Sequence, residues 1–160
     1  MSTLPQLIEE DVYTLNSALQ ELLAKTEASA ALVMDKAGFL ITQQGDSSQF
    51  DATTLGALAA GSFNANQAIA NLINEPNFSS VYQQGENYSL LVSNVDEYCL
   101  LLVLFKVGQS VGVVKYYAAI VIPRLAEQLK KAKERAPDAG LDLAVMNLAD
   151  PSSLFRKKEA

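Results

Sequence analysis

Few side chains in this chain of 160 residues have types and spacings that could carry out chemistry. It contains no histidine and a single cysteine, Cys99, so a Ser-His or Cys-His nucleophile pair is excluded and a zinc site is not expected. No Gly-rich loop ending in Gly-Lys-Ser/Thr, the pattern that cradles phosphates, is present. The carboxylates show no loop spacing typical of a bound cation. We therefore expect no bound metal, no cofactor and no enzyme activity of the chain's own.

Cys99 lies in the most apolar segment of the chain, YCLLLVLF. A reactive thiol needs exposure and positively charged surroundings, and this segment offers neither. We therefore predict that Cys99 is a core residue of a buried strand.

Composition indicates one globular domain. Hydrophobic residues make up 49% of the chain and charged residues 19%, which is enough to bury a core. The net charge of −6 argues against nucleic-acid binding, which needs a basic surface, and against attraction to anionic membranes. No signal peptide and no membrane-spanning run are expected, and a single cysteine fits a reducing compartment, so we predict a cytoplasmic protein.

Hydrophobic periodicity predicts three helices and five strands in the order αββαβββα. The helices are expected at residues 7–25, from the N-cap Asp51 toward Pro76, and from Ser110 to about Ala132. Pro123 predicts a kink or a break in the last of these. The strands are expected at residues 29–34, 39–44, 80–84, 88–95 and 98–105. Short turns predict a five-stranded antiparallel sheet with helices on both faces, which is a three-layer α/β sandwich.

This domain is expected over residues 1–135, and residues 136–160 are expected to form a C-terminal tail, in which Gly140 and Pro151 interrupt any regular pattern. The tail carries a few apolar residues, ending in Leu154 and Phe155 followed by three basic residues. Two interpretations stay open for it: an unstructured terminus, or a segment that orders on a partner.

The second helix is unusual because residues 52–74 contain no charged side chain. At 100° per residue, one side carries Leu55, Leu58, Ser62, Ala65, Ile69 and Leu72, and we expect this side to pack on the sheet. The opposite side is small and neutral, so we predict that it is an interface with a partner or a second copy rather than a bland exposed surface. It carries Ala57, Ala60, Gly61, Asn64, Gln67, Ala68 and Asn71.

Several motifs, taken in order, resemble the roadblock (dynein light-chain) family and its bacterial MglB-like members. They are ALVMDKAGFLITQQGD, FDATTLGALAAG, NYSLLVSNV, the apolar strand to Phe105, and SVGVVK. The resemblance covers roughly residues 5 to 132. It implies a roadblock-type sandwich that forms homodimers or heterodimers, with the second helix packed against its mate and the third strand paired edge to edge.

The resemblance also implies a function. MglB-like proteins activate a small Ras-like GTPase (MglA-like) in bacterial cell polarity and gliding motility, so a concentration at a cell pole is expected. Many activators insert an arginine finger. Here the arginines are Arg124, Arg135 and Arg156, and none lies on the predicted interface helix. The expected mechanism is therefore a reshaping of the GTPase, with Leu154, Phe155 and Arg156 as a possible second contact.

Two other functions stay open. A roadblock scaffold or adaptor would bind a GTPase or a motor complex without stimulating hydrolysis. A small-molecule sensor or an enzyme would need a clustered polar constellation, which the sequence does not show.

Overall fold

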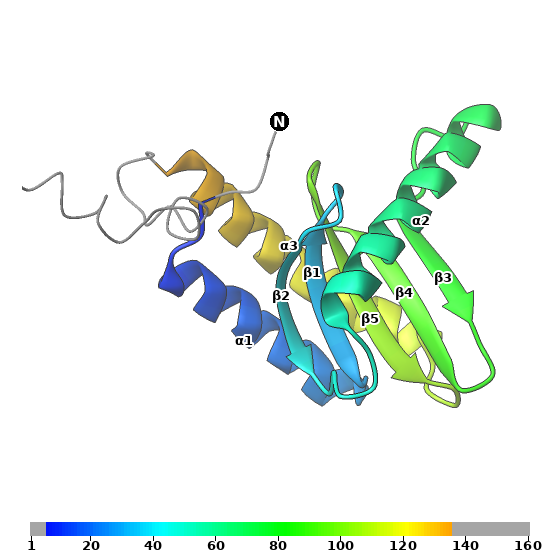
Figure 1. Ribbon diagram of the computed structural model, residues 1–160, viewed down its shortest axis with the longest axis horizontal. Coiled ribbons are helices and arrows are strands. Elements are labelled where there is room, and N and C mark those ends of the chain that lie inside the picture. The colour runs from blue at the N-terminus through cyan, green and yellow to red at the C-terminus, as the bar shows by residue number, and fades with distance from the viewer. Residues whose placement is uncertain (1–5, 136–160) are drawn as a thin grey trace, which may run out of the picture.

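The most apolar strand, β5 (Cys99–Lys106), lies at the centre of the sheet. It pairs with β1 (Ala30–Asp35) on one side and with β4 (Tyr88–Asn94) on the other. The edges are β2 (Leu40–Gly45) and β3 (Ser80–Gln84), which gives the order β2-β1-β5-β4-β3 with every neighbouring pair antiparallel. The computed structural model describes residues 6–135 of the chain (Figure 1).

Helices cover the two faces of the sheet unequally. The helices α1 (Glu9–Thr26) and α3 (Val111–Glu134) pack side by side on one face, and α2 (Ala52–Leu72) lies alone and obliquely across the other (Figure 1). Alternate residues of β1 enter two separate apolar clusters: Ala31 and Val33 face α1 and α3, whereas Leu32 and Met34 face α2. The central strands are thus buried on both faces, as their continuous apolar runs indicated.

The predicted three-layer sandwich with the order αββαβββα is confirmed. Strand boundaries agree to within about a residue, and the side chain of Asp51 caps α2 by accepting a hydrogen bond from the backbone N–H of Thr53 at 3.1 Å. The break expected at Pro123 is not found, because α3 continues through it from Val111 to Glu134. Pro123 is exposed, so its ring lies on the solvent side of the helix.

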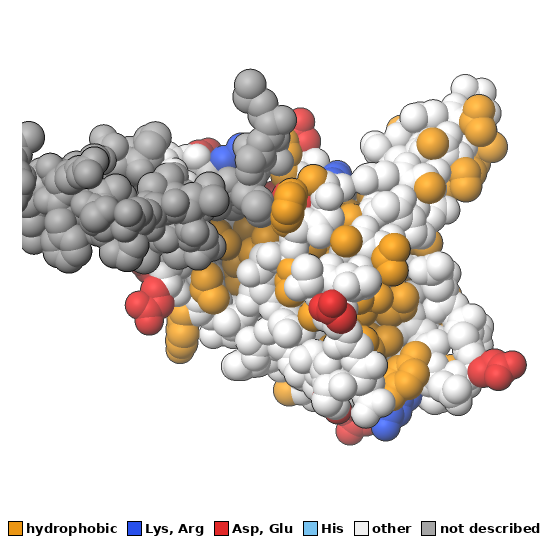
Figure 2. All heavy atoms as spheres, in the orientation of Figure 1, with side chains coloured by type: hydrophobic (Ala, Val, Ile, Leu, Met, Phe, Trp, Pro, Cys, Tyr) orange, Lys and Arg blue, Asp and Glu red, His pale blue; other side chains and the backbone are white. Residues whose placement is uncertain are grey.

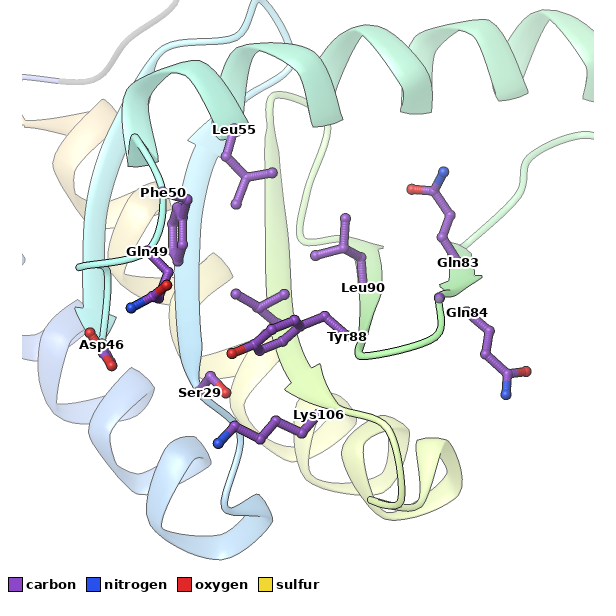
Figure 3. A pocket seen from close by; sticks show the side chains of 12 residues that line it. Ser29, Asp46, Gln49, Phe50, Leu55, Gln83, Gln84, Tyr88, Leu90 and Lys106 are labelled. Atoms are coloured by element: carbon purple, nitrogen blue, oxygen red, sulfur yellow. The ribbon is translucent and has the colours of Figure 1, made fainter.

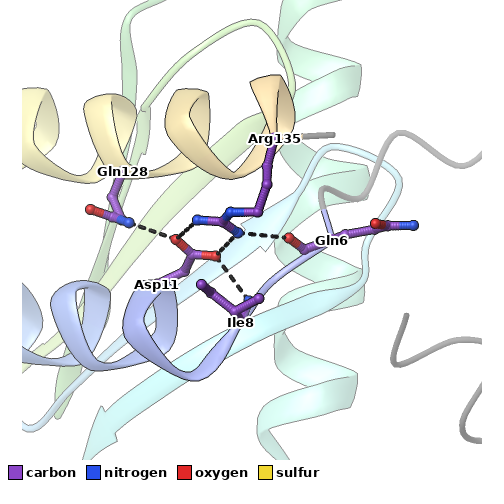
Figure 4. A network of polar contacts seen from close by, with 5 residues as sticks. All are labelled: Gln6, Ile8, Asp11, Gln128 and Arg135. Carbon is purple, nitrogen blue, oxygen red and sulfur yellow. Dashed lines mark hydrogen bonds and ion pairs between the residues drawn. The ribbon is translucent and has the colours of Figure 1, made fainter. Parts of the chain in front are cut away.

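A buried ion pair joins the start of α1 to the end of α3 (Figure 4). Both carboxylate oxygens of Asp11 accept hydrogen bonds from the Arg135 guanidinium, at 2.7 and 2.9 Å. Gln128 Nε2 and the backbone N–H of Ile8 donate two more, at 2.6 and 2.9 Å. Asp11 is fully buried, and the Arg135 hydrogen bonds in particular lower its pKa from 3.8 to about 2. Its charge is therefore retained inside the fold.

Among residues 6–135, no helix has both the length and the apolar character needed to cross a membrane.

Replacing Asp11 with alanine should lower the free energy of unfolding by about 3 kcal/mol at neutral pH, because four buried or partly buried hydrogen-bond donors lose their acceptor. The folded pKa of Asp11 is depressed, so its stabilisation is complete above about pH 4 and is lost as the pH falls through about 2. The difference in free energy of unfolding between the wild type and the Asp11→Ala variant should therefore shrink as the pH falls from about 4 to about 2.

Urea unfolding of the wild type and of Asp11→Ala at several pH values measures this difference in free energy. The matched control is Glu21→Ala, which removes the exposed ion pair of Glu21 with Arg124 and should cost less than about 1 kcal/mol. Equal losses in both variants would contradict a special role for the buried pair.

Candidate functional site

The helix α2 presents a different face to the sheet from the one predicted. Its buried residues are Ala52, Gly56, Ala59, Ala60, Phe63 and Ala70. Of the six residues expected on the sheet side, only Leu55 and Ser62 are partly buried. The prediction is wrong for Leu58, Ala65, Ile69 and Leu72, which are exposed; the three large side chains are 68%, 50% and 84% accessible to solvent. We call these four residues the apolar flank.

The physical reason lies in how closely α2 approaches the sheet. A Cβ on Gly56 would meet the sulfur of Met34 at 3.7 Å, so bulky sheet residues fill the space below small helix residues. Phe63 is the one large side chain of α2 that is fully buried. The spacing of Ala52, Ala59, Phe63 and Ala70 at seven, four and seven residues was the sequence signal for this face.

The seven residues predicted for an interface lie in three different environments. Ala57, Gly61 and Ala68 are exposed, and we call them the outward face; Ala57 lies next to Gly38 in the turn between β1 and β2. Asn64 and Asn71 are also exposed, and Gln67 is half-buried. Ala60 corrects the prediction, because it is only 1% accessible and packs in the apolar cluster between α2 and the sheet. It has no surface to offer a partner.

Beside the apolar flank, α2 leaves part of the sheet uncovered. An open cavity of about 690 Å³ lies there, the sheet groove, and Leu55 of α2 forms its upper wall (Figure 3). Leu90, Leu104 and Tyr88 line it from the sheet, and Phe50 lines it beside the start of α2. Figure 2 shows apolar side chains gathered over the sheet beside α2 and at the far end of that helix. Segments far apart in the chain build this groove, so no local pattern predicted it.

The strand β3 forms the sheet edge on the uncovered side. It pairs only with β4 in the part of the chain that the structure describes, so its outer backbone N–H and C=O groups face away from the sheet. Such an edge is a template for another strand. The sheet groove, the apolar flank and the open edge of β3 are therefore three neighbouring surfaces that have no partner in a single chain.

The groups capable of chemistry lie elsewhere or are already engaged. Cys99 is buried as predicted; burial, followed by the nearby Asp96 and Asp35, raises its pKa to about 12, so the thiol is inert. Within residues 6–135, no three His, Cys, Asp or Glu side chains gather in a way that could hold a metal ion. Arg156, Leu154 and Phe155, with the whole predicted tail 136–160, lie outside the described residues.

The two neighbours Ala60 and Gly61 test the corrected face. Arginine at position 60 should unfold the protein or lower its melting temperature strongly, because an unpaired charge would enter the apolar cluster. Arginine at position 61 should leave the melting temperature within a few degrees, because a Cβ there meets nothing within 4 Å. Circular dichroism melting of both variants measures this, and an Ala60→Arg protein that melts within a few degrees of the wild type would contradict the assignment.

Comparison with known protein families agrees with this architecture. The model of the roadblock/LC7 domain family matches residues 14–105, more than half of the chain. The search of curated proteins found no match to this chain.

Three solved structures share its fold closely. An MglB described as having a tetrameric arrangement is 27% identical, with a TM-score of 0.76 over 82% of this chain and 99% of that one. The gliding protein MglB of Thermus thermophilus is 28% identical, with a TM-score of 0.75 over 82% of this chain and 100% of that one. Myxococcus xanthus MglB is 26% identical, with a TM-score of 0.75 over 81% of this chain and 98% of that one. The chain therefore belongs to the roadblock/LC7 domain family.

Proposed function

We propose that the protein is a dimeric regulator of a small Ras-like, MglA-like GTPase, and that it stimulates GTP hydrolysis by reshaping the GTPase. The observation that carries the proposal is that α2 has two exposed, uncharged faces in addition to the one that packs on its own sheet. The similarity to MglB proteins supports the partner class and a role in bacterial cell polarity and gliding motility.

The apolar flank and the sheet groove together suit a second copy of the chain. Burying a leucine or isoleucine side chain contributes about 1.5–3 kcal/mol, so Leu58, Ile69 and Leu72 strongly favour a partner. An α2 from a second copy, laid beside the first, would cover the flank and lie over the groove. The open edge of β3 could then pair with its own copy around a two-fold axis, because one self-complementary surface serves both chains.

The outward face remains available after the flank is covered, since its three residues are exposed and are not part of the flank. In such a dimer the two outward faces would lie side by side and form a platform of small residues. Ala57, Gly61 and Ala68 let a partner approach the helix backbone closely, and none of them carries a charge. We assign this platform to the GTPase.

Within residues 6–135, neither arginine is placed to act as an arginine finger in this arrangement. Arg124 and Arg135 lie within and at the end of α3, on the opposite face of the sheet from α2, and they are engaged by Glu21 and Asp11. A contact through the outward face would supply shape rather than charge. It would accelerate hydrolysis by favouring a GTPase conformation whose own catalytic groups are in place.

A roadblock scaffold is the second candidate, and one observation favours it. The outward face carries no ionisable group, so it can bind a GTPase without contributing anything to the charge that develops during hydrolysis. The two functions differ in turnover, because an activator acts at substoichiometric amounts.

Leu72→Glu should convert the dimer into a monomer, because a carboxylate would be buried in the contact between the two α2 helices. Leu72 is exposed in the single chain, so the fold should survive. Light scattering after size-exclusion chromatography measures the mass. The matched control is Tyr116→Glu, an exposed apolar residue of α3 on the other side of the molecule, which should leave the dimer intact. A dimeric Leu72→Glu protein would show that the flank is not the dimer contact.

Ala68→Arg should keep the dimer and remove GTPase binding, because a long charged side chain would stand on the platform. The assay uses the small Ras-like GTPase of the same genome, with this protein at a few mole per cent and then in two-fold excess. Multiple-turnover acceleration by the wild type at the low dose, lost in Ala68→Arg, is the expected result. Tight binding without acceleration would make the protein a scaffold, and the absence of binding would refute the proposed function.

A further inference from the structure

A second hollow lies on the flank of α2 opposite the apolar flank. Its volume is about 560 Å³, and it lies at the end of the sheet where the turn between β1 and β2 meets the turn between β4 and β5. Five carboxamide side chains line it, from α2, from the loop before β3 and from the end of β4. They are Asn64, Gln67, Asn71, Asn77 and Asn94, and we call this site the amide hollow.

Two of these carboxamides hold the walls in place. Asn64 Nδ2 donates to the backbone oxygen of Lys36 and Gln67 Nε2 donates to that of Phe78, both at 2.9 Å. Each bond ties α2 to a loop and leaves the side-chain oxygen free to accept another. The side chains of the other three carboxamides make no hydrogen bond within residues 6–135. Asn71 and Asn77 are exposed and Asn94 is half-buried, so their donors and acceptors are available to a ligand.

The chemistry of the lining selects a neutral, polar ligand. The ionisable residues of the lining are Lys36 and Glu97, whose opposite charges cancel, so the site favours neither an anion nor a cation. Phe63 and Phe78 add an apolar wall. A carboxamide offers a carbonyl acceptor and two N–H donors, the same groups as a peptide bond. Several carboxamides together therefore match a stretch of polypeptide main chain, which has a donor and an acceptor at each residue.

The amide hollow continues directly from the outward face. Along α2, Asn64 follows Gly61 by three residues, and Asn71 follows Ala68 by three, so each carboxamide is the surface neighbour of an outward-face residue. A protein seated on the outward face reaches the rim of the hollow without bridging a gap. Its volume lies within the range of about 300–1,000 Å³ that is usual for ligand sites.

We propose that the amide hollow binds a short main-chain segment of the protein that occupies the outward face. This inference rests on the proposed function and names how the GTPase is held: the outward face supplies close contact, and the carboxamides orient the partner through its backbone. Main-chain recognition depends on the conformation of a segment more than on its side chains. The hollow would therefore distinguish the conformational states of one partner.

Asn71→Asp and Asn94→Asp test this with almost no change of shape. Each replaces an N–H₂ donor by a carboxylate oxygen, which repels the carbonyl that the donor would have bound. We expect each variant to weaken binding of the GTPase, loaded with a non-hydrolysable GTP analogue, by about tenfold. The matched control is Asn87→Asp in the turn between β3 and β4, at the other end of the sheet, which should bind within about twofold of wild type.

Isothermal titration gives the affinities. Light scattering and thermal melting confirm that each variant is a folded dimer. If an aspartate variant is not a folded dimer, Asn71→Ala or Asn94→Ala is measured in its place. Wild-type affinity in the hollow variants, with Ala68→Arg still defective, overturns this inference and leaves the proposed function standing. No binding by the wild type overturns both. A rise in melting temperature with millimolar free glutamine that Asn94→Asp abolishes also overturns it, because the hollow would then be a small-molecule site.

Discussion

The structure depends on the difference in width between a single helix and a five-stranded sheet. Strands lie about 4.8 Å apart and a helix is about 10 Å across, so one helix covers roughly two or three strands of a sheet. On one face, α1 and α3 together pack on β1, β2, β4 and β5. On the other face α2 is alone, and its main contacts are with β1, β2 and β5. The part of this face around Tyr88, Leu90 and Leu104 therefore has no helix over it, and the sheet groove and the exposed apolar flank follow from that deficit.

Local patterns were sufficient to predict the sheet. Each strand is a short apolar or alternating run between turns, and the uncharged apolar run that ends at Phe105 indicated the central place of β5. The turns are too short for crossover helices, which made antiparallel pairing the expected arrangement. The cap at Asp51 could also be predicted, because it depends on residues two and three positions away.

The buried face of α2 could not be predicted in the same way, because the helix has two apolar stripes. One consists of small residues and Phe63, and the other of leucines and isoleucine. Reasoning from a single chain assigns the larger side chains to the core. The sheet reverses this, since Leu32, Met34, Leu100 and Leu102 already fill the space beneath α2. The pairing of Asp11 with Arg135 was also beyond local reasoning, because the two residues are separated by 124 positions.

The absence of charge from α2 now has a physical reason in the proposed assembly. In that assembly one helix would contact three things: its own sheet, a second copy and a GTPase. A lysine or glutamate on any of them would lose its hydration in a contact that offers no partner charge. Small residues on the outward face permit close approach, but they cannot distinguish one partner from another, because they offer almost no hydrogen bonds. Discrimination must then come from the rim of that contact, where the carboxamides of the amide hollow, Lys36 and Glu97 lie.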